Sequence, residues 1–348
     1  MKFNFLNLPL LLSITFLLSV SFLVIYSSSQ NLAILQIIFA LIGILIFFLI
    51  SQINYNINPV LVKGMYILII LLLIFVMILG IETRGSIRWI PLGPVNIQPS
   101  EFAKPVIILL LSGFWALNQP GWVNILKSIL ILLPVLFLIF RQPDLGTTLT
   151  IGAIWAGMLF ATNISFKKIA ILILATLVIT PLIWFSLQDY QKQRITSFIT
   201  PQNDPLGVGY NLIQSTIAVG SGQFFGRGLG YGTQSRLQFL PEFRTDFIFA
   251  TIAEEFGFLG SLLILSLYIF LIGYSFKVAS RADYTGSLIA TGVAVMLIFQ
   301  VSVNIGMNIG LLPITGITLP LLSYGGSSLI ATLVSLGLVA SIAKVKKR

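Results

Sequence analysis

Acid–base chemistry in this 348-residue sequence depends on ten acidic residues, because it contains no His and no Cys. These absences exclude a disulfide framework, a thiolate nucleophile, an imidazole base and the usual ligands of zinc or haem. A general base must then be a carboxylate, a Lys or a Tyr. The acids are Glu82, Glu101, Asp144, Asp189, Asp204, Glu242, Asp246, Glu254, Glu255 and Asp283. If the protein is an enzyme, we expect its base among them.

Two acids and a lysine stand at the outer ends of apolar segments. Glu101 and Lys104 are three residues apart, so on a helix they share a face and can pair. Two interpretations stay open: an ion pair that fixes the helix in a bundle, or a lysine that faces an anionic ligand. Ser100 is expected to cap this helix. Asp144 follows Pro143 between two spans, where a helix N-cap and a functional role are equally good interpretations.

Asp246 begins a segment that continues to Phe276 and is longer than a bilayer core. We therefore expect its first turns to project into a water-filled cavity, with Asp246 at the mouth and Glu254 ~12 Å deeper along one helix. The alternative for Asp246 is a helix N-cap. For Glu254 and Glu255 we expect a structural network.

Cations are numerous in the segments predicted to lie outside, and guanidinium groups suit phosphate through paired hydrogen bonds. An anionic lipid head group is one explanation, and ordinary loop charge is the other. These cations are Arg84, Arg88, Arg141, Lys192, Arg194, Arg227, Arg236 and Arg244.

The composition indicates the elements that must position these groups. Apolar residues make up 57% of the chain and charged residues 9%, whereas soluble domains carry about a quarter charged. We predict an all-α polytopic membrane protein with one integral membrane domain, 1–348, and a glycine-rich outer loop over 188–245, in which 210–219 forms a short amphipathic helix. The ten predicted spans are 8–27, 31–51, 61–81, 99–117, 124–140, 145–162, 166–187, 246–275, 286–311 and 324–343.

Positive charge in the short loops predicts that both termini are cytoplasmic. The net charge of +10 is assigned to this topology and to contact with anionic membrane lipid, not to nucleic acid. The inner cations are Lys2, Lys63, Lys127, Lys167, Lys168, Lys277, Arg281, Lys344, Lys346, Lys347 and Arg348.

Several motifs, in order from about residue 80 to the end, resemble those of the shape, elongation, division and sporulation family. They are Arg88–Gly93, Gln98–Lys104, Gln142–Gly146, Asp204–Gly207, Leu240–Glu242, Thr245–Phe249, Glu254–Gly257 and Pro313–Ser328. The run Gly230–Ser235 is more similar to the RodA branch than to the FtsW branch. Arg244 departs from the family pattern, which usually has His before the Thr-Asp pair.

The resemblance implies a peptidoglycan glycosyltransferase of the bacterial cytoplasmic membrane that serves cell elongation and rod shape. Such enzymes polymerise lipid II into glycan strands at the outer face, beside a class B penicillin-binding protein. The reaction is inverting: a sugar hydroxyl attacks the lipid-linked anomeric carbon, and undecaprenyl pyrophosphate leaves. Alternatives are a lipid II flippase, a division-specific polymerase and a scaffold. A candidate acid at the outer mouth favours the enzyme, because transporter sites lie near the midplane.

By resemblance Asp246 is the base, which agrees with the short inventory of carboxylates. The resemblance also implies a cavity with the structural residues Glu254, Glu255 and Ser323. No cofactor is assigned with certainty, and Mg²⁺ or Mn²⁺ is left open as a partner of the pyrophosphate. The residues expected to bind substrate are Trp89, Glu101, Lys104, Asp144, Arg194 and Arg244, of which Lys104, Arg194 and Arg244 would face the pyrophosphate.

Overall fold

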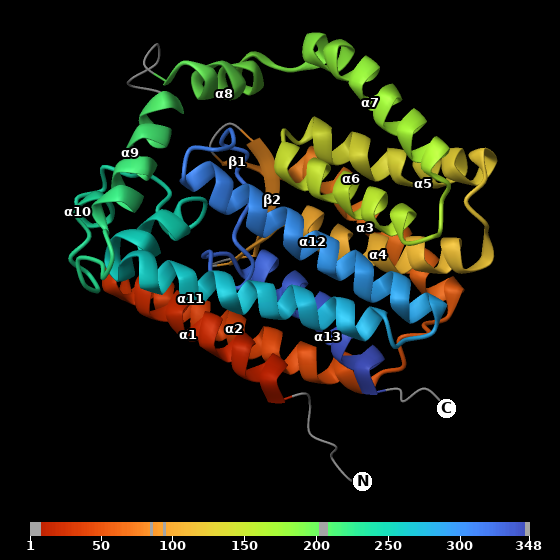
Figure 1. Ribbon diagram of the computed structural model, residues 1–348, viewed down its shortest axis with the longest axis horizontal. Helices are drawn as coiled ribbons and strands as arrows, with labels where there is room; N and C mark the ends of the chain where they lie inside the picture. Colours follow the sequence, from red (N-terminus) through yellow and green to blue (C-terminus); the bar gives the residue numbers. More distant parts are fainter. Residues whose placement is uncertain (1–7, 84–85, 93–94, 202–207, 345–348) are drawn as a thin grey trace.

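The computed structural model describes residues 8–83, 86–92, 95–201 and 208–344 (Figure 1). The motif Asp204–Gly207, Gly93 and the cationic tail 345–348 lie outside the described residues. The chain forms a bundle of long helices. These are α1 (Leu8–Ser28), α2 (Gln30–Gln52), α3 (Pro59–Leu79), α4 (Pro99–Leu117), α5 (Trp122–Arg141), α6 (Leu145–Phe160), α7 (Phe166–Ser186), α11 (Ile248–Ala279), α12 (Tyr284–Asn308) and α13 (Gly326–Lys344).

These helices occupy the predicted ranges, and the ends differ by up to four residues. Eight of the described helices are long and apolar enough to cross a membrane, and α6 is a shorter apolar helix. The protein is therefore a multi-pass membrane protein of helical fold. The number of crossings and the side on which 188–245 lies stay predictions.

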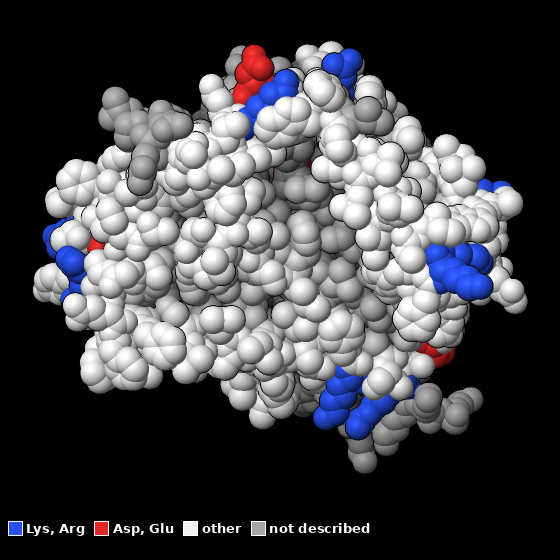
Figure 2. All heavy atoms as spheres, turned by 45° about the horizontal axis from the view of Figure 1, so that its top comes forward, with Lys and Arg blue, Asp and Glu red and all other residues white. Residues whose placement is uncertain are grey.

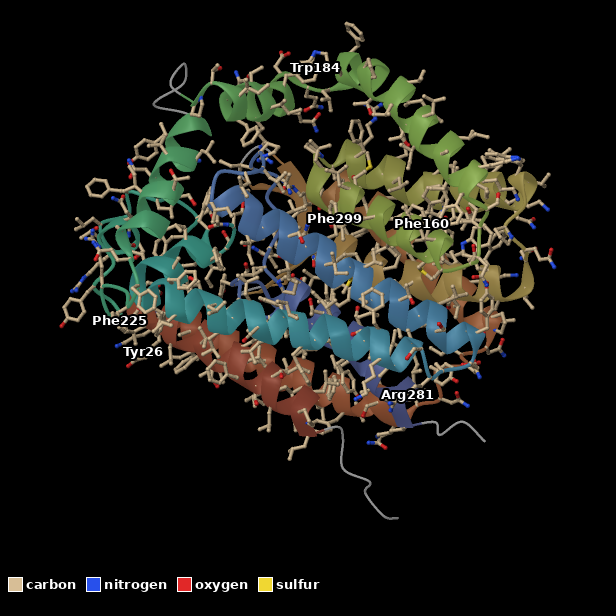
Figure 3. All side chains as sticks on the ribbon, viewed as in Figure 1. Tyr26, Phe160, Trp184, Phe225, Arg281 and Phe299 are labelled. Carbon is tan, nitrogen blue, oxygen red and sulfur yellow. The ribbon has the colours of Figure 1, made fainter. Side chains whose placement is uncertain are left out.

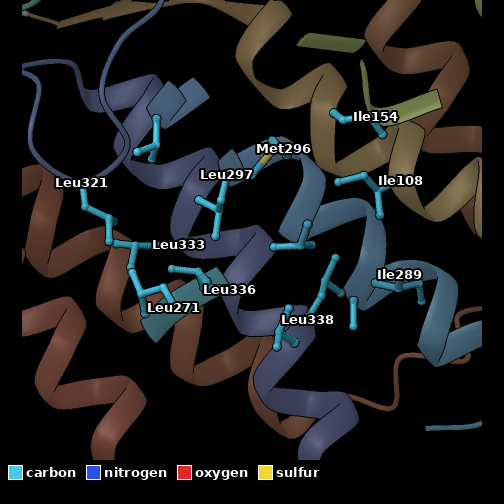
Figure 4. Packing of buried hydrophobic residues seen from close by; sticks show 14 of the residues in the cluster. Ile108, Ile154, Leu271, Ile289, Met296, Leu297, Leu321, Leu333, Leu336 and Leu338 are labelled. Carbon is cyan, nitrogen blue, oxygen red and sulfur yellow. The ribbon is translucent and has the colours of Figure 1, made fainter. Parts of the chain in front are cut away.

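The centre of the bundle is formed by α4, α12 and α13, whose side chains are mostly buried. Helix α13 packs along α2, and α12 packs against α11, α6 and α4. Figure 4 shows how Ile108, Met296 and Leu336 fill the spaces between these helices. By contrast, much of α3 is exposed, as expected for a helix that faces lipid. Polar groups on the central helices are thus kept away from hydrocarbon.

One end of the bundle carries the smaller elements. Three short antiparallel strands, β1 (Ile81–Thr83), β2 (Ser86–Leu92) and β3 (Val95–Ile97), follow α3 in the order β1-β2-β3. Helices α8 (Asp189–Ile199) and α9 (Val208–Ser221) continue from α7 as an arch around the edge of the bundle (Figure 1), and α10 (Thr233–Arg236) follows. Helix α9 contains the predicted helical segment 210–219.

A second hydrophobic core fixes this end to the bundle. Leu212 of α9 packs with Phe243 and Phe247, which precede α11, and with Met307 near the end of α12. The residues just before α11 are therefore anchored between α9 and α12.

Helix α11 differs from the predicted continuous helix in two ways. It begins at Ile248, so Asp246 lies in the preceding turn, and it is interrupted at Gly257, where φ is 67° and ψ is −162°. This region of backbone space is open almost only to glycine. The prediction that Asp246 and Glu254 lie on one helix is therefore wrong, because α11 does not include Asp246.

A glycine-rich strap, residues 222–228, crosses the interruption in α11. The N–H groups of Arg227 and Gly228 donate to the carbonyl oxygens of Glu254 and Glu255, each at 2.9 Å. The N–H of Phe258 donates in turn to the carbonyl of Gln223 at 2.9 Å. The strap thus supplies partners for backbone groups that the broken helix leaves without their own, as an apolar environment requires.

Candidate active site

Asp246 lies half-buried in the turn before α11, and the N-cap position of that helix is Phe247. The helix-cap interpretation of Asp246 is therefore wrong. Its carboxylate faces Gly316, where a methyl group added to the backbone would lie 3.5 Å from Asp246 Oδ2. The same methyl group would lie 3.8 Å from Nη1 of Arg194, which comes from α8. A carboxylate and a guanidinium from distant parts of the chain thus converge on one point of the 309–325 loop.

Two buried amides that the sequence reasoning missed hold the backbone of Asp246. Nδ2 of Asn304 and Nδ2 of Asn308 each donate to the Asp246 carbonyl at 3.0 Å. Their signal in the sequence is a pair of amides four residues apart in an apolar span, which places them on one helix face. Ser323 lies beside them, and its hydroxyl donates to the Thr245 carbonyl at 2.6 Å.

Arg244 points away from this point. Its Nε donates to Ser28 Oγ at 2.8 Å and its Nη2 to the Ser28 carbonyl at 3.1 Å, while the guanidinium lies 4.5 Å from the ring centroid of Phe243. Partial burial lowers the pKa of Arg244, and the charge of Glu242 opposes this shift. Arg244 therefore ties the turn before α11 to the end of α1. Of the two predicted pyrophosphate ligands Arg194 and Arg244, Arg194 is thus the one placed near Gly316 and Asp246.

Asp144 is the buried centre of a second polar cluster. Its Oδ1 accepts from the Thr147 N–H at 3.1 Å as the N-cap of α6. Its Oδ2 accepts from Gln98 Nε2 at 3.0 Å and from Ser100 Oγ at 3.0 Å. Arg88 Nη1 lies 3.8 Å from Oδ1. Ser100 is thus a partner of Asp144, and the expectation that it caps α4 is wrong, because the N-cap position is Gln98.

Glu101, in the first turn of α4, forms an ion pair with Lys104. Lys104 Nζ lies 2.7 Å from Glu101 Oε2, and both side chains are buried. This geometry leaves both earlier interpretations of Lys104 open. Trp89, next to Arg88 on β2, is half-buried and lies opposite Ile81 in the sheet.

The 309–325 loop connects the Asp144 cluster to Asp246. A methyl group added to Gly146, two residues after Asp144, would lie 2.7 Å from Ile317 Cγ1. Gly316, the neighbour of Ile317, faces Asp246 as described above. The two clusters therefore share one wall.

Glu254 and Glu255 hold the segment around α10 and the strap. Glu254 is fully buried, and its Oε1 accepts from the Gln234 N–H at 2.9 Å while Oε2 accepts from the Ser235 N–H at 3.3 Å. Glu255 Oε1 accepts from the Gly230 N–H at 3.0 Å. These contacts are what a structural network requires.

An apolar groove of about 770 Å³ lies between α2, α3, α4 and α13. It reaches Ile90 and Ile97 of the sheet and Pro99 at the start of α4, close in sequence to the Asp144 cluster. The other lining residues include Ile69, Phe75, Phe102, Val106 and Leu338. Such a lining suits an aliphatic chain.

The face shown in Figure 2 is hollowed in its middle, where charged side chains are sparse, and Lys and Arg lie around its margin. Figure 3 places Arg281 at the edge where the two ends of the chain lie, and Trp184 at the opposite edge.

In the described part of the chain, no three acidic side chains come together as a metal site.

Comparison with known proteins places the chain in a family. A family model described as cell cycle protein, which covers FtsW, RodA and SpoVE, matches residues 1–348. The chain therefore belongs to this family of membrane proteins.

Its relatives include the peptidoglycan glycosyltransferase MrdB of Escherichia coli K12, 41% identical over 343 residues that cover 96% of this chain and 92% of MrdB. Stage V sporulation protein E of Bacillus subtilis is 37% identical over 321 residues, 90% of this chain and 87% of that protein.

Two solved structures resemble the fold over nearly its full length. A chain from a peptidoglycan synthase complex, studied for its coordination of polymerization and crosslinking, has a TM-score of 0.84 and 30% identity and covers 98% of both chains. The rod shape-determining protein RodA of Thermus thermophilus has a TM-score of 0.75 and 28% identity, with full coverage of both chains.

Proposed function

We propose that this protein is a peptidoglycan glycosyltransferase that polymerises lipid II at the outer face of the cytoplasmic membrane, with Asp246 as its general base. The reaction class is that of MrdB, which aligns with almost the whole chain. The observation that carries the proposal is the convergence of the Asp246 carboxylate and the Arg194 guanidinium on Gly316.

The proposed chemistry divides between these two side chains. Asp246 accepts the proton of the acceptor sugar hydroxyl as that oxygen attacks the anomeric carbon of the lipid-linked donor. The bond from this carbon to the pyrophosphate breaks, and Arg194 stabilises the charge that develops on the leaving group. No second carboxylate is needed as an acid, because pyrophosphate leaves without protonation. We assign no step to a metal ion.

The surrounding residues support this assignment in different ways. The apolar groove beside α4 offers a place for the polyprenyl chain, since its lining is aliphatic and aromatic. We propose that the main role of Lys104 is structural: it stabilises α4 through its ion pair with Glu101. Asp144 positions the sheet and α4 by holding Arg88, Gln98 and Ser100.

We also propose that the protein works beside a class B penicillin-binding protein during cell elongation. The similarity to a chain of a peptidoglycan synthase complex supports a partner that crosslinks, and the similarity to MrdB and RodA supports the elongation role. We further propose that both termini are cytoplasmic, as the positive charge of the short loops predicts.

The test is a polymerisation assay with labelled lipid II and purified protein, with and without the penicillin-binding protein. We expect glycan polymer on a gel from the wild type and at least about 100-fold less polymer from Asp246→Ala of equal thermal stability. Equal polymer from Asp246→Ala would remove this residue as the base. Translocation of lipid II across liposomes without any polymer would instead support a flippase.

A further inference from the structure

Three consecutive backbone carbonyl groups, those of residues 244–246, are each held by a donor from the segment 304–324. The pairs are the Arg244 carbonyl with the Tyr324 N–H at 2.8 Å, the Thr245 carbonyl with Ser323 Oγ at 2.6 Å, and the Asp246 carbonyl with Asn304 Nδ2 and Asn308 Nδ2, each at 3.0 Å. Because each bond fixes one peptide plane, the turn that carries Asp246 has little freedom to rotate.

The two asparagines are fully buried, and their amide groups join three elements. Asn304 Nδ2 also donates to the Ile317 carbonyl at 2.7 Å, in the loop that faces Asp246. Asn308 Oδ1 accepts from the Ala250 N–H at 3.0 Å, in the first turn of α11. Buried amides are unfavourable in an apolar span unless they are bonded, and a leucine would satisfy packing alone. The structure therefore uses these amides to fix the turn relative to the loop.

We propose that Asn304 and Asn308 are positioning residues that hold the Asp246 carboxylate beside Gly316, which the Arg194 guanidinium also approaches. This inference rests on the proposed function, in which Asp246 is the base. With its carbonyl fixed, the Asp246 backbone sets the direction of the Cα–Cβ bond and hence of the carboxylate. Without the amides the turn relaxes, and a misplacement of about 1 Å lowers a reaction rate by about 100-fold.

The test is steady-state kinetics of lipid II polymerisation by Asn304→Leu, with Gln300→Leu as the matched control. Gln300 is buried one turn earlier on α12, and its Oε1 has no hydrogen-bond partner among the described residues. We expect Asn304→Leu to lower kcat by about 10- to 100-fold and to leave KM for lipid II within about twofold. Gln300→Leu should match the wild type in both. A kcat for Asn304→Leu equal to that of Gln300→Leu, or a raised KM alone, would overturn the inference.

A double variant separates positioning from a general structural effect. If Asn304 acts through Asp246, the residual rate of Asp246→Ala is not lowered further by adding Asn304→Leu. A further loss in the double variant contradicts the inference. If Asp246→Ala polymerises like the wild type, the assignment of Asp246 as the base fails and the inference falls with it. If Asn304→Leu is fully active while Asp246→Ala is not, the inference alone fails.

Ser323→Ala provides the same test should Asn304→Leu not fold. It removes the hydroxyl that donates to the Thr245 carbonyl and accepts from the Leu319 N–H at 2.8 Å. We expect a smaller loss, about three- to tenfold in kcat with KM unchanged. An unchanged kcat in a folded Ser323→Ala protein would count against the role of this segment in aiming Asp246.

Discussion

Replacing Gly257 by alanine should destabilise the protein strongly, because two separate features of the α11 interruption require glycine. The backbone at Gly257, with φ 67° and ψ −162°, costs about 1–3 kcal/mol for any other residue. The new methyl group would also lie 2.2 Å from the Gly226 nitrogen and 2.7 Å from the Phe224 carbonyl oxygen. The strap must then move and lose hydrogen bonds to α11, each worth about 1–3 kcal/mol when its buried partner is left unsatisfied.

These contributions together predict a loss of at least about 3 kcal/mol in the free energy of unfolding. The assay is unfolding of purified protein in detergent, followed by intrinsic fluorescence, with limited proteolysis of residues 222–240 as a local measure. Gly273→Ala is the control, since it lies on the same helix and its methyl group would meet nothing within 4 Å. It should stabilise by about 0.5–1 kcal/mol through helix propensity. Equal unfolding midpoints for both variants would refute the reasoning.

Three further predictions concern other buried polar groups. Lys104→Met should destabilise by about 3–5 kcal/mol because it leaves the Glu101 charge buried and unpaired, and adding Glu101→Gln should restore most of the thermal stability. If the double variant then polymerises lipid II normally, Lys104 has no role at the pyrophosphate. Glu254→Gln should loosen α10 by about 1–3 kcal/mol, seen as faster proteolysis of residues 222–240, because two N–H groups lose a charged acceptor. Burial and a 2.6 Å hydrogen bond to Asp283 raise the pKa of Tyr55 to about 12, so the protonated phenol is favoured in the folded state. Its stabilising contribution should be complete below pH ~10 and lost as the pH rises towards 12, whereas Tyr55→Phe should show no such loss in unfolding measured across that range.

Local spacing allowed part of the site to be predicted. The pairing of Glu101 with Lys104 follows from their spacing of three residues on one helix. Asp144 caps a helix that begins at the next residue. Hydropathy likewise located the long helices, because spanning a bilayer requires continuous apolar segments. These features depend on residues within one or two turns of each other.

The contacts that the sequence did not reveal join distant segments. Arg194 and Asp246 both approach Gly316 because the arch of α7, α8 and α9 carries α8 around the edge of the bundle to the 309–325 loop. The hydrogen bond from Arg244 to Ser28 could not be predicted either, because it depends on how α1 packs against α11. The break at Gly257 was not predicted, because the strap whose backbone bonds to the residues around it lies about 30 residues earlier in the chain.

The central claim is tested most directly by the initial rate of lipid II polymerisation in Asp246→Asn, a variant that keeps the shape of the side chain and removes its basicity. Asp189→Asn is the matched control, because Asp189 is an exposed acid at the start of α8. We predict a rate lower by about 10²- to 10⁴-fold for Asp246→Asn and a rate within about twofold of the wild type for Asp189→Asn. A rate for Asp246→Asn within about threefold of the wild type would contradict the assignment of Asp246 as the general base.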